Sequence, residues 1–188
     1  MFEALLERLA AELTRANIPY MVIGGQAVLL YGEPRTTRDI DITLGIGVEG
    51  FARVRDVVDR LGLRILAAAP LEFVRDKMVL PAAEDATGIR VDFVFSFTPY
   101  EQQAITRAVP VRIGAADVRF AAMEDVVIHK VFAGRPRDED DVRGMLLRNP
   151  NYDRPYVEQW LRQFDAALAR NLFGRFQQLA ADAGPSRR

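Results

Sequence analysis

The stretch VIGGQA (residues 22–27) is followed after a short interval by RTTRDID (residues 35–41). The first stretch continues a hydrophobic run, a predicted strand, into the glycine pair Gly24-Gly25, and the second ends in two carboxylates, Asp39 and Asp41. In a β-strand, residues i and i+2 project from the same face. We therefore expect both carboxylates to point to one side of a strand adjacent to the one that ends at the glycines.

The composition is that of an ordinary globular protein. The chain has 188 residues, of which 49% are hydrophobic and 27% charged, and it contains no cysteine. This length suits one domain, or one domain with a helical appendage. No run approaches the ~18 apolar residues of a membrane span, and residues 1–4 (MFEA) lack the pattern of a signal peptide. The expected location is the cytoplasm, and disulfides and thiolate metal sites are excluded.

The formal net charge of −1 argues against a protein that coats nucleic acid non-specifically. Such binding depends on a strongly basic face. A small local basic patch remains compatible with this value. Lys77 and Lys130 are the only lysines in the chain, and every other basic residue is an arginine.

Periodicity divides the chain into a sheet-forming part and a helical part. Apolar residues at helical spacing over residues 5–13 predict an amphipathic helix that ends before Pro19. Other helices are expected over 26–31, over 48–61 up to Gly62, and from Pro99. The predicted strands are 20–23, 40–44, 63–66, 73–80, 89–97, 109–113 and 118–120, the last two as a hairpin. From Met123 the pattern is helical, with breaks at 134–136, 149–151 and 171–174.

These elements predict a mixed α/β sheet followed by a helical C-terminal region. We assign residues 1–121 to the sheet-containing core and residues 122–183 to the helical region. Residues 184–188 (GPSRR) are expected to form a disordered tail.

Asp39 and Asp41 are the first candidate metal ligands. Side-by-side carboxylates repel each other and raise each other's pKa unless a positive charge lies between them. A hard cation that prefers oxygen ligands, such as Mg²⁺, would remove this repulsion. The alternatives are a solvated edge strand, or ion pairs with Arg35 and Arg38.

The glycine pair is the first candidate substrate-binding element. Glycines between a strand and a helix let backbone N–H groups approach a phosphate at the positive end of the helix dipole. The alternative is that Gly24 and Gly25 only make a tight turn, because short glycine motifs often occur by chance.

Asp92 is the candidate third carboxylate. Its neighbours Val91, Phe93, Val94 and Phe95 place it in a strand of the core. A carboxylate in such a strand must pair with a cation or coordinate a metal. The alternative partners are Arg90 and Arg112, and Glu72 or Asp76 would be the next candidates for the third carboxylate.

Four further residues are candidate substrate contacts. Arg35 and Thr37 precede the carboxylates and could hold phosphate groups or simply cap the turn. Lys130 could neutralise a phosphate as a point charge, or extend from a half-buried helix. Arg135 precedes a predicted helix start and would contact phosphate or RNA, as would Arg137, if it faces the same cleft. The single histidine, His129, is expected to be structural.

These motifs resemble those of a known superfamily. Gly24-Gly25-x-Ala27 followed by Arg35-x-Thr37-x-Asp39-Ile40-Asp41 is similar to the signature of the nucleotidyltransferases that include DNA polymerase β. The narrower resemblance is to AbiEii-type and minimal nucleotidyltransferases, many of which are toxins of toxin–antitoxin pairs, and it extends to residues 124–138. The broader superfamily has Gly-Ser after the first strand, where this chain has Gly24-Gly25.

The resemblance implies an enzyme with a mixed-sheet nucleotidyltransferase fold, whose catalytic core is residues 1–121. It would move a nucleoside monophosphate from a nucleoside triphosphate to an acceptor hydroxyl and release pyrophosphate. Two Mg²⁺ or Mn²⁺ ions would be held by Asp39 and Asp41, with Asp92 completing the site and helping to activate the acceptor. The expected acceptor is RNA, at the 3′ end of tRNA, and an antitoxin protein is an expected partner. The alternatives are a small molecule such as an antibiotic, a protein acceptor, or a domain that binds nucleotide without turning it over.

Overall fold

The computed structural model describes residues 2–33, 37 and 39–183. The chain forms two compact units. Unit 1 comprises Met1–Gln26 and Thr36–Ala121, and unit 2 comprises Ala27–Arg35 and Ala122–Arg188. Helix α2 (Gly24–Tyr31) contributes its first three residues to unit 1 and the rest to unit 2. The predicted tail, residues 184–188, lies outside the described residues.

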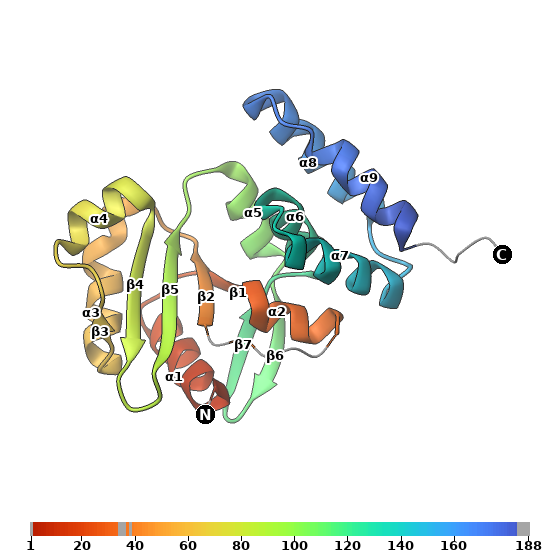
Figure 1. The fold of residues 1–188 in the computed structure, drawn as a ribbon. Helices are drawn as coiled ribbons and strands as arrows, with labels where there is room; N and C mark the ends of the chain where they lie inside the picture. The colour runs from red at the N-terminus through yellow and green to blue at the C-terminus, as the bar shows by residue number, and fades with distance from the viewer. Residues whose placement is uncertain (1, 34–36, 38, 184–188) are drawn as a thin grey trace. The chain divides into compact units, whose positions relative to one another are not determined.

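Unit 1 is built on a mixed sheet, shown in Figure 1. In the described residues it has seven strands in the order β3-β4-β5-β2-β1-β7-β6. The strands are β1 (Tyr20–Ile23), β2 (Asp39–Leu44), β3 (Arg64–Ile65), β4 (Val79–Glu84), β5 (Ile89–Phe95), β6 (Val109–Ile113) and β7 (Ala116–Phe120). The pairs β2–β5 and β1–β7 are parallel, and the other pairs are antiparallel. The predicted mixed α/β fold is confirmed.

Side-chain alternation along β2 separates a core face from a polar face. Ile40, Ile42 and Leu44 are completely buried, whereas Asp39 is exposed and Asp41 is partly exposed. Because successive side chains point to opposite faces, both carboxylates lie on the face away from these core residues. The alternation thus fixes the side of the sheet on which a polar site can form.

Helices α1 (Phe2–Arg15) and α3 (Phe51–Leu61) contact each other, and α1 also contacts β7. The leucines predicted to form the apolar stripe of α1 are buried. A short 3₁₀ helix, η1 (Val48–Gly50), precedes α3, and Gly62 ends α3 with a left-handed φ of 67°. Helix α5 (Pro99–Thr106) begins with a capping box formed by Thr98 and Glu101.

The prediction of a strand over residues 73–80 is wrong. Residues Pro70–Lys77 form helix α4, and strand β4 begins only at Val79. Pro70 is at the start of the helix, where its missing N–H has no helical partner to lose. Phe73 and Val74 suggested a buried strand, but Phe73 is 37% exposed and only Val74 of the helix is buried. The helix-start signal of Pro70 therefore decides the structure of this segment, and the apolar pair Phe73-Val74 does not make it a strand.

The two edges of the sheet are both short or interrupted. Strand β3 contains only two residues, fewer than predicted, and β6 carries Pro110 as its second residue. Proline cannot donate a backbone hydrogen bond, so it occurs in sheets mainly at edges. The predicted hairpin of β6 and β7 is present, with Ile113 paired to Ala116 across its turn.

Unit 2 is helical in its described residues. It contains α6 (Met123–Ala133), α7 (Pro136–Arg148), α8 (Arg154–Leu168) and α9 (Leu172–Asp182), together with Ala27–Tyr31 of α2. The core includes Val127, Val142, Met145, Leu161 and Phe176. The first two predicted breaks are present. The third falls before Leu172, so Gly174 lies inside α9 and not in the break.

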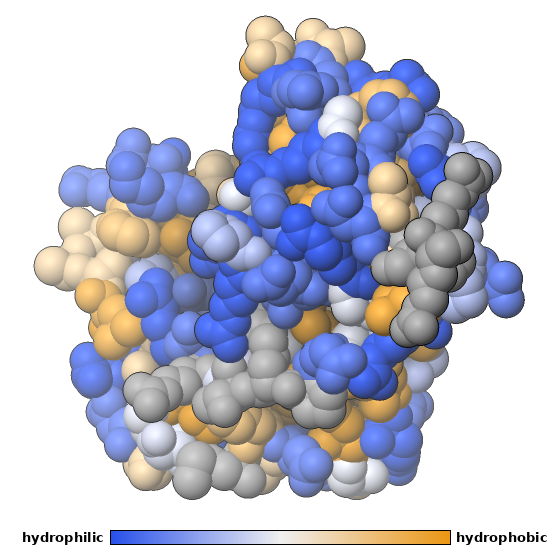
Figure 2. All heavy atoms as spheres, turned by 45° about the vertical axis from the view of Figure 1, so that its right-hand side comes forward, coloured by the Kyte–Doolittle hydropathy of each residue, from blue (hydrophilic) through white to orange (hydrophobic). Residues whose placement is uncertain are grey.

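The surface of the protein is mixed in polarity. On the face drawn in Figure 2, hydrophilic residues predominate and hydrophobic residues lie in separate groups. The most exposed large apolar side chains among the described residues are Phe97 at 69%, Leu147 at 65% and Leu168 at 50%. No helix in the described part of the chain is long and apolar enough to cross a membrane.

Candidate functional site

Strand β1 passes directly into helix α2 at the glycine pair. Gly24 has a φ of +65°, a conformation that side chains with a Cβ rarely adopt. A Cβ built on Gly24 would overlap the carboxylate of Asp41. The glycine is therefore required twice, once for the backbone turn and once for the close approach of Asp41 to the start of α2.

The sheet brings three predicted carboxylates to one face. Asp41 of β2 is the register partner of Asp92 in the parallel strand β5, and of Ile23 in the antiparallel strand β1. Asp39 precedes Asp41 by two residues and is the register partner of Arg90. Since register partners project from the same face, the three carboxylates and the Arg90 guanidinium form a patch of two cross-strand pairs. We call these four residues the carboxylate site.

Arg90 is a residue of this site that sequence reasoning considered only as an alternative partner of Asp92. Its Nε donates a 2.9 Å hydrogen bond to Oδ1 of Asp92, and the side chains are 49% and 19% exposed. The pKa of Arg90 is raised, chiefly by this hydrogen bond and then by the charges of Asp92, Asp39 and Asp41. Arg90 thus interacts electrostatically with all three carboxylates. The other alternative, Arg112, pairs with Asp117.

The donor chemistry of the carboxylate site suits a hard divalent cation. Its candidate metal ligands are carboxylate oxygens, which Mg²⁺ and Mn²⁺ prefer, and Gly24 leaves the Asp41 carboxylate room that any Cβ would fill. In the described residues, however, no three acidic, histidine or cysteine side chains converge into a metal-binding group. The residues fit the cation in type and face, while Arg90 supplies the positive charge beside Asp92.

The loop before β2 is described at Thr37 only. The hydroxyl of Thr37 donates a 3.3 Å hydrogen bond to the carbonyl oxygen of Asp39, which is the turn-capping alternative. Arg35 and Arg38 lie outside the described residues. The phosphate-binding roles of Thr37 and Arg35 stay predictions.

In unit 2, Lys130 and Arg135 meet at a second set of charges. Lys130 Nζ lies 2.8 Å from Oδ1 of Asp138 and 2.9 Å from Oδ2 of Asp141, and all three side chains are less than 10% exposed. Arg135 donates to Asp138 from Nε at 2.6 Å and from its backbone N at 3.2 Å. We call Lys130, Asp138 and Asp141 the buried charge cluster, which the exposed side chain of Arg135 contacts from the surface.

From the sequence, only Lys130 and Arg135 of this group were singled out, and not the aspartates that pair with them. Burial by itself would raise the pKa of Asp138, but the hydrogen bonds from Arg135 and Lys130 outweigh it and lower the pKa to about 2. The eight-residue spacing from Lys130 to Asp138 crosses the break between α6 and α7, so helical periodicity gave no signal of the contact. The phosphate-binding roles of Lys130 and Arg135 stay predictions, and a phosphate would have to compete with Asp138 for both.

His129 is buried in α6, and its burial lowers the pKa to about 4, with a further contribution from the charge of Lys130. The imidazole is therefore neutral at pH 7. On the next turn towards the N-terminus, the buried carboxylate of Asp125 accepts a 2.8 Å hydrogen bond from the Tyr156 hydroxyl. These contacts join α6 to α8.

Residues 2–171 match a family described as "nucleotidyltransferase of unknown function (DUF6036)". The chain belongs to this nucleotidyltransferase family. A search of curated proteins found no match. The resemblance to nucleotidyltransferases seen in the sequence motifs is therefore confirmed at the level of the superfamily.

Solved structures show the same fold. The solution structure of the antibiotic-resistance factor ANT(2″)-Ia has a TM-score of 0.61 at 19% identity, covering 89% of this chain and 92% of that one. The crystal structure of ANT(2″)-Ia in complex with adenylyl-2″-tobramycin has a TM-score of 0.52 at 16% identity, covering 96% and 95%. An antigenic nucleotidyltransferase-like protein from Paracoccidioides brasiliensis has a TM-score of 0.57 at 13% identity, covering 93% and 91%.

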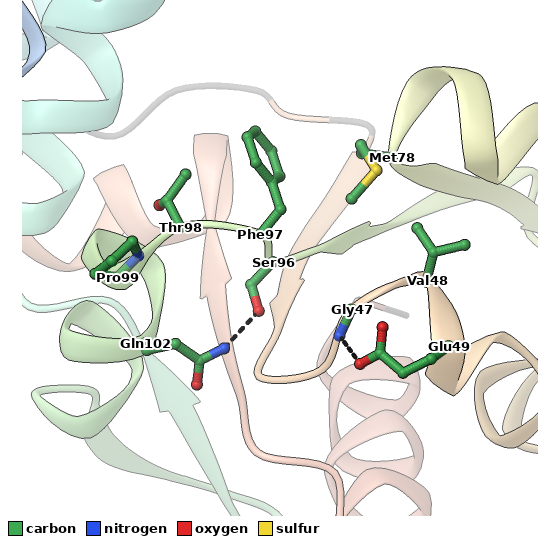
Figure 3. A pocket seen from close by; sticks show the side chains of 9 residues that line it. All are labelled: Gly47, Val48, Glu49, Met78, Ser96, Phe97, Thr98, Pro99 and Gln102. Carbon is green, nitrogen blue, oxygen red and sulfur yellow. Dashed lines mark hydrogen bonds between the residues drawn. The ribbon is translucent and has the colours of Figure 1, made fainter. Parts of the chain in front are cut away.

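Unit 1 also contains a pocket at the end of the sheet opposite the carboxylate site, shown in Figure 3. The pocket, about 550 Å³ in volume, is lined by Gly47, Val48, Glu49, Met78, Ser96, Phe97, Thr98, Pro99 and Gln102. Its polar groups are largely bonded to one another: Gln102 donates to Ser96 at 2.7 Å, and Glu49 accepts from the Gly47 backbone at 2.9 Å. Met78 lies just before β4, and the other lining residues follow the carboxyl ends of β2 and β5, whereas Asp39 and Arg90 lie near the starts of these two strands. The pocket is thus separate from the carboxylate site.

Proposed function

We propose that the protein is a Mg²⁺-dependent nucleotidyltransferase that moves a nucleoside monophosphate from a nucleoside triphosphate to an acceptor hydroxyl. The observation that carries this proposal is the shared face of Asp39, Asp41 and Asp92, next to a glycine turn at which an added Cβ would overlap the Asp41 carboxylate. Membership of the nucleotidyltransferase family supports it.

Each residue of the site would have a defined part. Asp39 and Asp41 would hold the metal with Asp92, and the metal would neutralise charge on the phosphates during transfer. The first N–H groups of α2, at Gly24 and Gly25, would face the negative phosphates at the positive end of the helix dipole. Asp92 would also accept the proton of the attacking hydroxyl, which needs a base within hydrogen-bond reach.

For the acceptor, we propose RNA, at the 3′ end of tRNA, and a cytoplasmic toxin of the AbiEii type paired with an antitoxin. This choice rests on the likeness of residues 124–138 and of the two signature motifs to that group. The net charge of −1 requires that any RNA contact be local, because a protein of this charge has no overall attraction for the phosphate backbone.

A second candidate acceptor is a cationic small molecule such as an aminoglycoside antibiotic. Two observations favour it: the fold is similar to that of ANT(2″)-Ia, which was solved with an adenylylated tobramycin, and the net charge is slightly negative. A negative surface attracts a polycation and repels RNA. A protein acceptor, or a domain that only binds nucleotide, remains the alternative if neither class is modified.

The deciding experiment incubates the protein with each α-³²P-labelled nucleoside triphosphate and Mg²⁺, in parallel with total RNA and with a panel of aminoglycosides. Label in the tRNA band supports the first candidate, and label in an aminoglycoside supports the second. Asp41→Ala serves as the inactive control in both arms. Absence of label in RNA, antibiotic and added lysate protein, with nucleotide binding intact, would identify a binding domain and overturn the proposed transfer.

A further inference from the structure

The carboxylate site contains a cation of its own. Three carboxylates on neighbouring positions of two strands repel one another, and the arrangement needs a nearby positive charge to offset this repulsion. Arg90 meets this need among the described residues: it is the register partner of Asp39 and donates to Asp92 at 2.9 Å. It lies on the same strand face as Asp92, two residues before it.

We propose that Arg90 is the resident counter-ion of the carboxylate site and that a divalent cation must displace it from Asp92 to bind there. The inference rests on the proposed function, because it assigns the metal to the same three carboxylates. In the described residues the three carboxylates do not converge into a metal-binding group. While Oδ1 of Asp92 accepts from Arg90, that oxygen is directed to the guanidinium.

The pair has the exposure that an exchangeable contact requires. The Arg90 side chain is 49% exposed and that of Asp92 is 19% exposed, so water and ions can reach both partners. Half-exposed ion pairs contribute little net stability. A divalent ion with twice the charge of a guanidinium, bound by several oxygens, can replace such a contact.

Once it is displaced from Asp92, the Arg90 guanidinium is available to bind a second group. Once released from Asp92, the side chain remains anchored at the start of β5, beside Asp39. A guanidinium in this position can pair with the phosphate oxygens of a nucleotide, which match its donor geometry. Arg90 would then tie metal binding to nucleotide binding, and metal affinity should rise when the triphosphate is present.

The test is a titration of the full chain with Mn²⁺, in the absence of nucleotide, followed by electron paramagnetic resonance of the free ion. Arg90→Gln removes the charge and should tighten Mn²⁺ binding by about two- to fivefold, the range set by the strength of half-exposed ion pairs. Arg90→Lys keeps the charge and should bind Mn²⁺ nearly as wild type does. Arg64→Gln is the matched control, because Arg64 pairs with Asp85 at 2.8 Å on β3, which β4 separates from the strands of the carboxylate site.

Thermal melts give an independent measurement. Without metal, Arg90→Gln should melt below wild type because the carboxylates lose their counter-ion, and added Mn²⁺ should raise its melting temperature more than that of wild type. Arg64→Gln should show the wild-type increment. In the Asp92→Asn background, Arg90→Gln should no longer change the Mn²⁺ affinity, because the contact for which the metal competes is gone.

Three outcomes separate the inference from the function on which it rests. Tighter Mn²⁺ binding by Arg90→Gln, but not by Arg64→Gln, supports the counter-ion role. Equal or weaker binding by Arg90→Gln, with wild type binding Mn²⁺ normally, overturns the role and leaves the proposed function standing. If neither wild type nor Arg90→Gln binds Mn²⁺ or shifts its melting temperature, both the counter-ion role and the metal-dependent function are overturned.

Discussion

Two clusters of aspartates around a basic residue occur in this protein, and they differ chiefly in their access to water. At the carboxylate site, Arg90 is 49% exposed and contacts Asp92 at 2.9 Å. In the buried charge cluster, Lys130 is 7% exposed and lies between Asp138 and Asp141, at 2.8 and 2.9 Å. The residue types and distances are nearly the same.

The difference in exposure indicates different roles. A cationic side chain that is exposed to water can move away from its carboxylates, and another cation can replace it. If a buried cationic side chain moved away, it would leave its buried carboxylates without a compensating charge, which is energetically costly. We therefore propose exchange and chemistry for the carboxylate site, and the joining of α6 to α7 for the buried charge cluster. Charge pattern alone, without burial, would rank the two clusters as equal candidates.

Asp92→Asn should have the largest effect and tests the carboxylate half of this comparison. Asparagine keeps the shape but loses the charge that would bind metal and accept a proton, so transfer should fall by about 10²- to 10⁴-fold. Nucleotide binding should change little. The assay is the labelled-nucleotide transfer described above, with Asp117→Asn, which removes the partner of Arg112, as the control. Full activity of Asp92→Asn would show that its pairing with Arg90 is only structural.

Lys130→Met tests the buried half. Removing one partner of a buried ion pair leaves the other uncompensated, so the free energy of unfolding should fall by about 3–5 kcal/mol. Urea unfolding at pH 7 measures this. The only other lysine provides the control: Lys77 pairs with Asp76 at 2.9 Å, with both side chains more than half exposed, so Lys77→Met should change stability far less than Lys130→Met. Equal effects of the two substitutions would remove the distinction based on burial.

Acid should destabilise unit 2 in two steps. The pKa of His129 is lowered to about 4 in the folded protein, whereas in the unfolded chain it is near 6.5. Between these two values only the unfolded state takes up the proton, so the free energy of unfolding decreases as the pH is lowered from 6.5 to 4. The shift corresponds to about 3 kcal/mol at most. The lowered pKa of Asp138, about 2, adds stability that is present above pH 4 and lost between pH 4 and pH 2.

Urea unfolding at intervals between pH 7 and pH 3 tests this order. His129→Gln should flatten the slope above pH 4 and leave the lower one. Asp138→Asn should flatten only the lower slope. A single transition unaffected by either substitution would contradict the assignment of the two windows.

Gly24→Ala should have the smallest effect on stability, and it probes the turn beside Asp41. A left-handed residue with a Cβ costs roughly 1–2 kcal/mol, and the new methyl group also overlaps the Asp41 carboxylate. Gly62→Ala is a matched control because Gly62 has a φ of +67° with nothing within 4 Å of an added Cβ. Thermal melts should show loss in both variants, and transfer activity should be lost only in Gly24→Ala.

Much of the fold could be predicted because local signals agreed with the final packing. Strand β1 has the expected bounds, and the breaks on either side of α7 lie near the predicted positions, since glycine, proline and asparagine mark them. Helix α4 was missed because Phe73 and Val74 suggested a strand, whereas Pro70 marked a helix start. The shared face of Asp39 and Asp41 followed from alternation alone.

Other parts of the site could not be predicted because they depend on pairing between distant segments. Only the parallel register of β2 and β5 sets Asp41 opposite Asp92, 51 positions later in the chain. The same register brings Arg90 beside Asp39. From the sequence alone, Arg90 and Arg112 were equally possible partners of Asp92. Lys130 and Asp138 meet across a helix break, where no periodic pattern connects them.

The edges of the sheet have a consequence for how the protein behaves at high concentration. An exposed edge strand offers unpaired backbone groups to which a second molecule can add a strand, the first step of edge-to-edge aggregation. Here one edge, β3, offers only Arg64 and Ile65, and the other, β6, is interrupted by Pro110. Replacing Pro110 by Val would restore a continuous row of donors. Self-association, measured by light scattering, should then increase while the carboxylate site remains unchanged.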